Sequence, residues 1–148
     1  MYTNTDVLHN KLEELQTLAD NQSTDIIAIT ETLLKNMPAD AKPEDFVFSL
    51  RGYTSVLNYN GRGLCFFIKE SIDFIRVLDY DNYFKTCIFI QVKTSESKLT
   101  IGLMYRPTST NDDDNVQCIN MIDKVAHKYK SLNKRESGFN WRCKFSRH

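Results

Sequence analysis

The sequence has 148 residues, of which 41% are hydrophobic and 26% are charged, and its 19 Lys and Arg balance its 19 Asp and Glu. A chain of this length can bury roughly 70% of its unfolded surface, so we expect one domain, or part of one, with a substantial core. The composition excludes a fully disordered chain, and no apolar run approaches the roughly 20 residues of a membrane-spanning helix. We therefore expect no membrane partner.

The N-terminal residues lack the basic segment and the apolar run of a secretory signal. We expect an intracellular protein, with the nucleus as one candidate compartment. The cysteines contain no Cys-x-x-Cys pair, so we predict free buried thiols rather than a zinc site or a disulfide framework. The four cysteines are Cys65, Cys87, Cys118 and Cys143.

The net charge of zero hides an asymmetry along the chain. Residues 1 to 123 hold 11 Lys and Arg against 18 Asp and Glu, whereas residues 124 to 148 hold 8 against Glu136 alone. A basic segment of this kind can contact a polyanion, or it can be solvated without any partner. Charge alone leaves both interpretations open.

The first 30 residues predict a strand, a helix and a second strand. Residues 1 to 4 are β-prone, residues 6 to 20 carry an apolar helical stripe, and residues 25 to 30, DIIAIT, lack polar alternation. The second strand should therefore be covered on both faces in a layered α/β arrangement, with the helix as a crossover. The stripe of the helix consists of Leu8, Leu12, Leu15 and Ala19.

Beyond a proline-containing loop, the chain reads as a series of short β-prone runs separated by turn-like groups such as Asn60-Gly61-Arg62-Gly63. Short turns between closely spaced strands favour antiparallel pairing. The runs are FVFSL (46–50), GYTSVLNY (52–59), LCFFIK (64–69), IDFIRVL (72–78), CIFIQVK (87–93) and KLTIGLMY (98–105).

A second helix is predicted over residues 112 to 130, because acids precede an apolar stripe and lysines follow it, as the helix dipole favours. Residues 131 to 148 lose periodicity and form a basic tail, which gives two segments, 1–130 and 131–148. The stripe consists of Val116, Ile119, Ile122 and Ala126.

Glu31 follows the apolar strand directly, at the end where ligands of open α/β sheets collect. A carboxylate there can hold a hard cation such as Mg²⁺, with water and substrate phosphate completing the shell. A solvated loop acid or a helix cap is the alternative.

A later strand runs into Tyr105-Arg106-Pro107. The guanidinium of Arg106 can bind a phosphate with two donors, and the Tyr105 hydroxyl can supply a third. Without further evidence, the same residues could be a strand end with an interfacial tyrosine.

The order of these segments is more specific than any one of them. A Thr-Asn strand end, an L-x-x-K-x-x-E-L helix, DIIAITET, a Gly-Tyr strand, G-R-G-L-C-F-F-I-K and a strand ending in Tyr-Arg-Pro follow one another. This order resembles the endonuclease/exonuclease/phosphatase superfamily over residues 2 to about 130. It is especially similar to the endonuclease domain of non-LTR retrotransposon polyproteins, which also carry a reverse transcriptase.

The resemblance implies an α/β fold: a partial four-layer sandwich of mostly antiparallel strands with two main helices outside. It implies a Mg²⁺-dependent phosphodiesterase that nicks DNA. In the family's roles, Asn4 positions metal and phosphate, Glu31 binds the metal, Tyr105 lies near the scissile phosphate and Arg106 contacts phosphate. Gly61-Arg62-Gly63 corresponds to a structural turn.

The resemblance weakens after the second helix. The family's Gly-Asp-Phe-Asn motif is matched by Ser137-Gly138-Phe139-Asn140, so Asn140 keeps a catalytic position while Gly138 stands where the aspartate belongs. The family's terminal Ser-Asp-His motif is absent. We therefore expect a fragment of such a domain that is catalytically inactive and marginally stable, with unpaired strand edges.

Two alternatives remain at this level. One is a phosphatase or phosphodiesterase of the same superfamily that acts on a phosphorylated small molecule or lipid. The other is a non-enzymatic remnant that binds nucleic acid through its basic tail.

Overall fold

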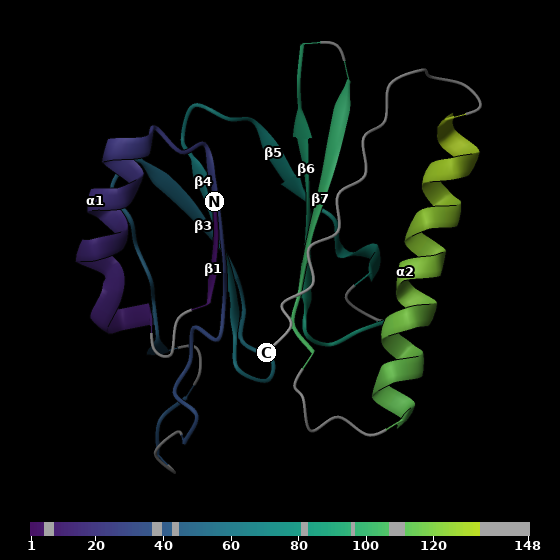
Figure 1. The fold of residues 1–148 in the computed structure, drawn as a ribbon, viewed down its shortest axis with the longest axis horizontal. Helices are drawn as coiled ribbons and strands as arrows, with labels where there is room; N and C mark the ends of the chain where they lie inside the picture. The colour runs from purple at the N-terminus through teal and green to yellow at the C-terminus, as the bar shows by residue number, and fades with distance from the viewer. Residues whose placement is uncertain are drawn as a thin grey trace.

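The chain folds into four layers in the order helix, sheet, sheet, helix, and Figure 1 shows α1 outside one sheet and α2 outside the other. The predicted four-layer sandwich is therefore confirmed. Among the described residues, no helix combines the length and the apolar character needed to cross a membrane. The computed structural model describes residues 1–4, 8–36, 40–42, 45–80, 83–95, 97–106 and 112–133.

The predicted crossover connection is present, because β1 and β2 are parallel neighbours in the first sheet and α1 connects them in the chain. A 3₁₀ turn precedes α1, and Ser23 ends the helix in the left-handed conformation, with its backbone N–H donating to the Ala19 carbonyl. The bounds are β1 Tyr2–Asn4, η1 Leu8–Lys11, α1 Leu12–Gln22 and β2 Ile26–Thr30.

The remaining strands pair antiparallel, as predicted. The first sheet has the order β1-β2-β4-β3, and the second has the order β5-β6-β7. The described strands β1, β3, β5 and β7 are thus edge strands. The bounds are β3 Tyr53–Asn58, β4 Leu64–Lys69, β5 Phe74–Arg76, η3 Leu78–Tyr80, β6 Cys87–Lys93, β7 Lys98–Met104 and α2 Asp112–Asn133.

The strand predicted at residues 46–50 is wrong. Residues 46 to 49 are irregular, and Leu50 makes only an isolated bridge to Tyr53. Phe48 and Leu50 are nevertheless buried. The alternating apolar residues of this segment therefore reflect packing of a loop against the core, not pairing in a sheet.

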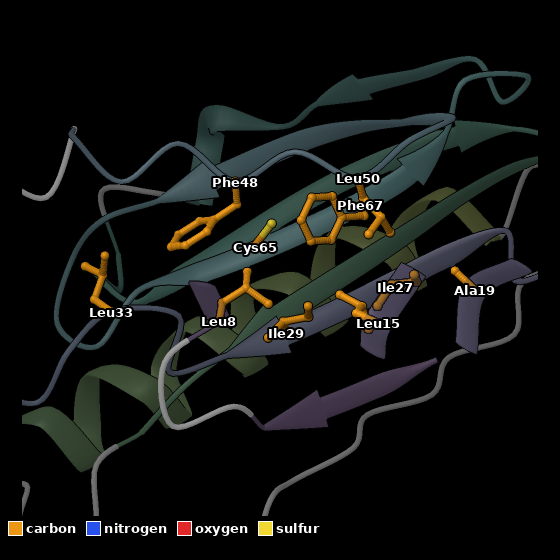
Figure 2. Close-up of a cluster of buried hydrophobic side chains, with 10 residues drawn as sticks. All are labelled: Leu8, Leu15, Ala19, Ile27, Ile29, Leu33, Phe48, Leu50, Cys65 and Phe67. Atoms are coloured by element: carbon orange, nitrogen blue, oxygen red, sulfur yellow. The ribbon is translucent and has the colours of Figure 1, made fainter. Parts of the chain in front are cut away.

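The first core cluster lies between α1 and the first sheet (Figure 2). In β2, Ile27 and Ile29 join this cluster, whereas Ile26 and Ala28 pack toward the second sheet. Successive side chains of a strand point to opposite faces, so burial on both faces explains why DIIAIT lacks polar alternation. The buried residues are Leu8, Leu15, Ala19, Ile27, Ile29, Leu33, Phe48, Leu50, Cys65 and Phe67.

The second cluster fills the space between the two sheets. Strand β4 contributes to both clusters, since Cys65 and Phe67 face α1 while Leu64, Phe66 and Ile68 face the other sheet. Burial on both faces makes β4 the centre of the molecule. The buried residues between the sheets are Val56, Leu64, Phe66, Ile68, Ile88, Ile90, Val92 and Leu103.

The third cluster, between the second sheet and α2, corrects the predicted face of that helix. Val116 and Ile119 are 54% and 58% exposed, whereas Cys118, Met121 and Val125 are buried. Each buried residue lies one position before a residue of the predicted stripe, and Ile122 of that stripe is partly buried against the same cluster, so the buried face is shifted by less than the roughly 100° that one residue spans. The remaining buried residues of this cluster are Tyr80, Phe84, Cys87 and Phe89.

Three of the cysteines are free and buried, as predicted: Cys65, Cys87 and Cys118. Burial raises the pKa of the Cys65 thiol. Burial also raises the pKa of the Cys118 thiol, an effect that the positive charge of Arg106 opposes. Cys143 lies outside the described residues.

The orientation of α2 can be tested by two alanine substitutions on the same helix. Met121→Ala should lower the free energy of unfolding by about 2–4 kcal/mol, because Met121 is fully buried and its removal leaves a cavity. Ile119→Ala should change it by no more than about 0.5 kcal/mol. Guanidinium denaturation of both variants measures the difference, and a larger loss for Ile119→Ala would restore the originally predicted face.

Candidate active site

One end of the sandwich, the lower end in Figure 1, collects the last residues of β1, β2, β3 and β7 and the first residues of β4 and β6. In the first sheet, Asn4 and Leu64 pair with Thr30 from opposite sides, and Asn58 pairs with Leu64. The strand ends predicted to carry chemistry, those before Glu31 and Tyr105, therefore lie at the same end of the molecule.

Asn58 joins the two sheets at this end. Its side chain is buried, and its amide nitrogen donates to the carbonyl oxygens of Lys85 at 2.9 Å and of Cys87 at 2.8 Å. Its side-chain oxygen accepts from the backbone N–H of Asn60 at 2.8 Å. The buried amide thus satisfies backbone groups of the second sheet and holds them against the β3–β4 turn.

Glu31 follows β2 with a backbone φ of 59°, in the left-handed region. Non-glycine residues occupy this region rarely and at a cost, and such strain is found most often at functional sites. The Glu31 side chain is only 16% exposed. The carboxylate is therefore partly removed from water at the end of a central strand.

The turn at residues 60 to 63 is hydrogen-bonded to the segment after β2. The backbone N–H of Leu33 donates to the Arg62 carbonyl at 2.9 Å, and that of Thr32 donates to the Gly63 carbonyl at 3.4 Å. Gly63 has a φ of 75°, and a Cβ there would lie 2.3 Å from the Thr32 hydroxyl oxygen. Only glycine meets both demands.

This pairing puts the Arg62 side chain beside Glu31. The Arg62 Nη2 and Glu31 Oε2 atoms are 3.4 Å apart, and the Arg62 side chain is 19% exposed. The Arg62 Nε donates to the Leu33 carbonyl at 3.3 Å. The sequence resemblance treated this arginine as part of a structural turn, whereas the structure makes it an ion-pair partner of the predicted metal ligand.

Tyr105 and Arg106 extend from β7 at the same end. The backbone of Tyr105 continues the ladder, since its N–H donates to the Thr86 carbonyl at 3.1 Å and its carbonyl accepts from the Thr86 hydroxyl at 2.6 Å. The Tyr105 side chain is half-buried against the core between the sheets. Arg106 is exposed, and its Nη1 donates to Asn115 Oδ1 of α2 at 2.6 Å.

The predicted site residues thus divide into two groups. Glu31, Tyr105 and Arg106 lie at one end of the sandwich, together with the backbone of Asn4. The Asn4 side chain and the segment containing Asn140 lie outside what the structure describes. Sequence reasoning missed Asn58, although a polar residue at the end of a strand buried on one face was a usable signal.

A cation at this end would find few protein ligands. In the described part of the chain, no three His, Cys, Asp or Glu side chains gather as a metal site. Mg²⁺ is commonly bound through one or two carboxylates, with waters and substrate phosphates as its other ligands. The Glu31 carboxylate fits a Mg²⁺ site of that sparse kind.

Neither a protein-family model nor a curated protein sequence matches the chain. Several solved structures are similar to it, including the following two. The endonuclease domain of TRAS1, a telomere-specific non-LTR retrotransposon, aligns with a TM-score of 0.61 at 14% identity over 86% of this chain. The AP endonuclease LMAP from Leishmania major aligns with a TM-score of 0.63 at 12% identity over 93% of this chain.

The chain has the endonuclease/exonuclease/phosphatase-like fold. It spans 52% of the length of each of these two structures. At such low identity the similarity establishes the fold and leaves the activity to be argued from the residues.

The role of Asn58 can be tested against its neighbour Asn60. Asn58→Ala should lower the free energy of unfolding by about 2–4 kcal/mol, because two carbonyl groups lose a donor and a buried volume is vacated. Asn60 is exposed and its side chain donates to the Lys85 carbonyl at 3.0 Å, so Asn60→Ala should cost about 1 kcal/mol or less. Urea denaturation distinguishes the two; equal losses would show that Asn58 does not join the sheets.

The close approach at Gly63 is tested with Gly52 as a control. Both glycines have a positive φ, but a Cβ at Gly52 would meet nothing within 4 Å. Gly52→Ala should cost about 1–2 kcal/mol from backbone strain alone. Gly63→Ala should cost at least about 1–3 kcal/mol more, because the added Cβ overlaps Thr32 and Leu33, and thermal unfolding would measure the gap.

Proposed function

We propose that the chain is the N-terminal part of a retrotransposon-type endonuclease domain, which binds DNA at the Glu31 end of the sandwich and does not nick DNA by itself. The observation that supports this most is the meeting of Glu31 and Tyr105-Arg106 at one end of a fold shared with two endonucleases. In open α/β sheets, ligands bind at the carboxyl ends of the strands, and Glu31 and Tyr105 directly follow such strand ends.

Each residue has a role that its chemistry can perform. Mg²⁺ bound at Glu31 would offset charge on the phosphate oxygens and activate water. Arg106 is exposed and carries donors suited to a phosphate group, and the Tyr105 hydroxyl can donate to a phosphate oxygen. Asn4 ends β1 beside Thr30, where a side-chain amide can assist in positioning the phosphate.

The proposed lack of turnover depends on residues of the catalytic set. Gly138 stands where the related motif has aspartate, and glycine has no side chain that could accept a proton or orient the nucleophile. Removing one member of a catalytic set usually costs orders of magnitude in rate. Binding of cation and phosphate needs fewer groups, so we propose that binding is retained without cleavage.

Binding is tested with a fluorescently labelled DNA duplex, by anisotropy in Mg²⁺ or in chelator. The duplex should bind more tightly in Mg²⁺, and Glu31→Ala should abolish that difference. Arg106→Ala should weaken binding about tenfold, as expected for loss of a charged hydrogen-bond donor. Arg51→Ala is the matched control, since Arg51 is exposed and precedes β3 at the opposite end of the sandwich.

Turnover is measured in parallel with supercoiled plasmid. The wild-type chain, shown to be folded by circular dichroism, should leave the plasmid intact in Mg²⁺. Metal-dependent nicking that Glu31→Ala abolishes would contradict the proposed inactivity and support the site. DNA binding that neither Mg²⁺ nor Glu31→Ala changes would contradict the site itself.

A further inference from the structure

The Arg62–Glu31 ion pair is built into the backbone of the site. Two backbone hydrogen bonds fasten the turn to the segment after β2, and the Arg62 Nε is held by the Leu33 carbonyl. The guanidinium therefore meets the Glu31 carboxylate without any ligand to bring them together. Neither the turn nor the strand has to move for the pair to form.

The pair is partly screened from water but is not tightly closed. Both side chains are less than one-fifth exposed, and the nearest nitrogen and oxygen atoms are 3.4 Å apart. A charge-assisted hydrogen bond at full strength would be shorter, about 2.7–2.9 Å. The pair therefore places a positive charge beside the carboxylate without a short hydrogen bond between these two atoms.

We infer that Arg62 is a charge-exchange residue: it neutralises Glu31 when no ligand is bound, and it turns to the substrate phosphodiester when a divalent cation binds Glu31. This inference rests on the proposed function of the Glu31 end. When a divalent cation binds the Glu31 carboxylate, it repels the guanidinium of Arg62 beside it, so Arg62 can stay there only at a cost in free energy. A phosphate at the same end gives the released guanidinium a bidentate partner.

The exchange makes binding of the cation and binding of the phosphodiester positively cooperative. Without phosphate, the cation must displace Arg62 from the carboxylate with no compensation. With phosphate present, the displaced guanidinium gains an anionic partner. By thermodynamic reciprocity, each ligand then raises the affinity for the other.

The test measures Mn²⁺ binding to the full 148-residue chain. Electron paramagnetic resonance detects the free ion, so the measurement does not depend on turnover. Arg62→Gln should raise Mn²⁺ affinity about tenfold, because the positive charge of Arg62 competes with the cation for the Glu31 carboxylate. Arg62→Lys retains the charge and should stay near wild type. Dimethyl phosphate, at constant ionic strength, should raise Mn²⁺ affinity in wild type and not in Arg62→Gln.

Two controls assign the effect to Glu31. Glu31→Gln should lose the Mn²⁺ site, and the double variant Glu31→Gln/Arg62→Gln should not regain it. Arg51→Gln removes an equal charge from a solvent-exposed pair with Asp20 and should leave Mn²⁺ affinity unchanged. Arg62 itself does not have a positive φ, so its substitution leaves the glycine turn intact, which circular dichroism would verify.

The outcomes separate this inference from the proposed function. Equal or weaker Mn²⁺ binding in Arg62→Gln, still dependent on Glu31, would overturn the charge exchange and leave the proposed site standing. Mn²⁺ binding that Glu31→Gln does not affect, or no binding in any variant, would overturn both. Tighter binding that requires Glu31, with the phosphate effect lost, supports the exchange.

Discussion

Burial of β4 on both faces is the constraint on which the rest of the structure depends. Its side chains alternate between the core under α1 and the core between the sheets, so both halves of the sandwich are packed against one strand. A one-residue slip would exchange the two sets and expose a mismatched face to each core. The register of β4 also sets the site, because Leu64 aligns both Thr30 and Asn58 at the same end.

Three costly features lie at that end of the sandwich. Asn58 buries an amide between the sheets, Glu31 adopts a left-handed backbone, and Gly63 approaches Thr32 too closely for any side chain. Each feature costs free energy that the three apolar cores must offset. Proteins retain such costs most often where geometry serves binding, which is consistent with the proposed role of this end.

Local pattern was sufficient for most elements and for the position of Glu31 and Tyr105 directly after strands, because strand periodicity and strand ends are properties of neighbouring residues. The loop at 46–50 has the apolar alternation of a strand because its side chains are alternately buried against the core and exposed. The buried face of α2 depends on which of two overlapping apolar stripes meets the second sheet. The sequence of the helix alone does not determine which stripe that is. Arg62 could not be paired with Glu31 from spacing, since backbone hydrogen bonds between the turn at residues 60 to 63 and the segment after β2 bring them together.

The cysteines give this sandwich internal reporters of its opening. Cys65 lies between α1 and the first sheet, whereas Cys87 of β6 and Cys118 of α2 lie between the second sheet and α2, so the described thiols sample the two outer interfaces separately. Burial raises the pKa of the Cys65 and Cys118 thiols, which disfavours the thiolate that reacts rapidly. In a chain with Cys143 replaced, the rate at which each thiol is alkylated would therefore report how often each helix layer lifts from its sheet.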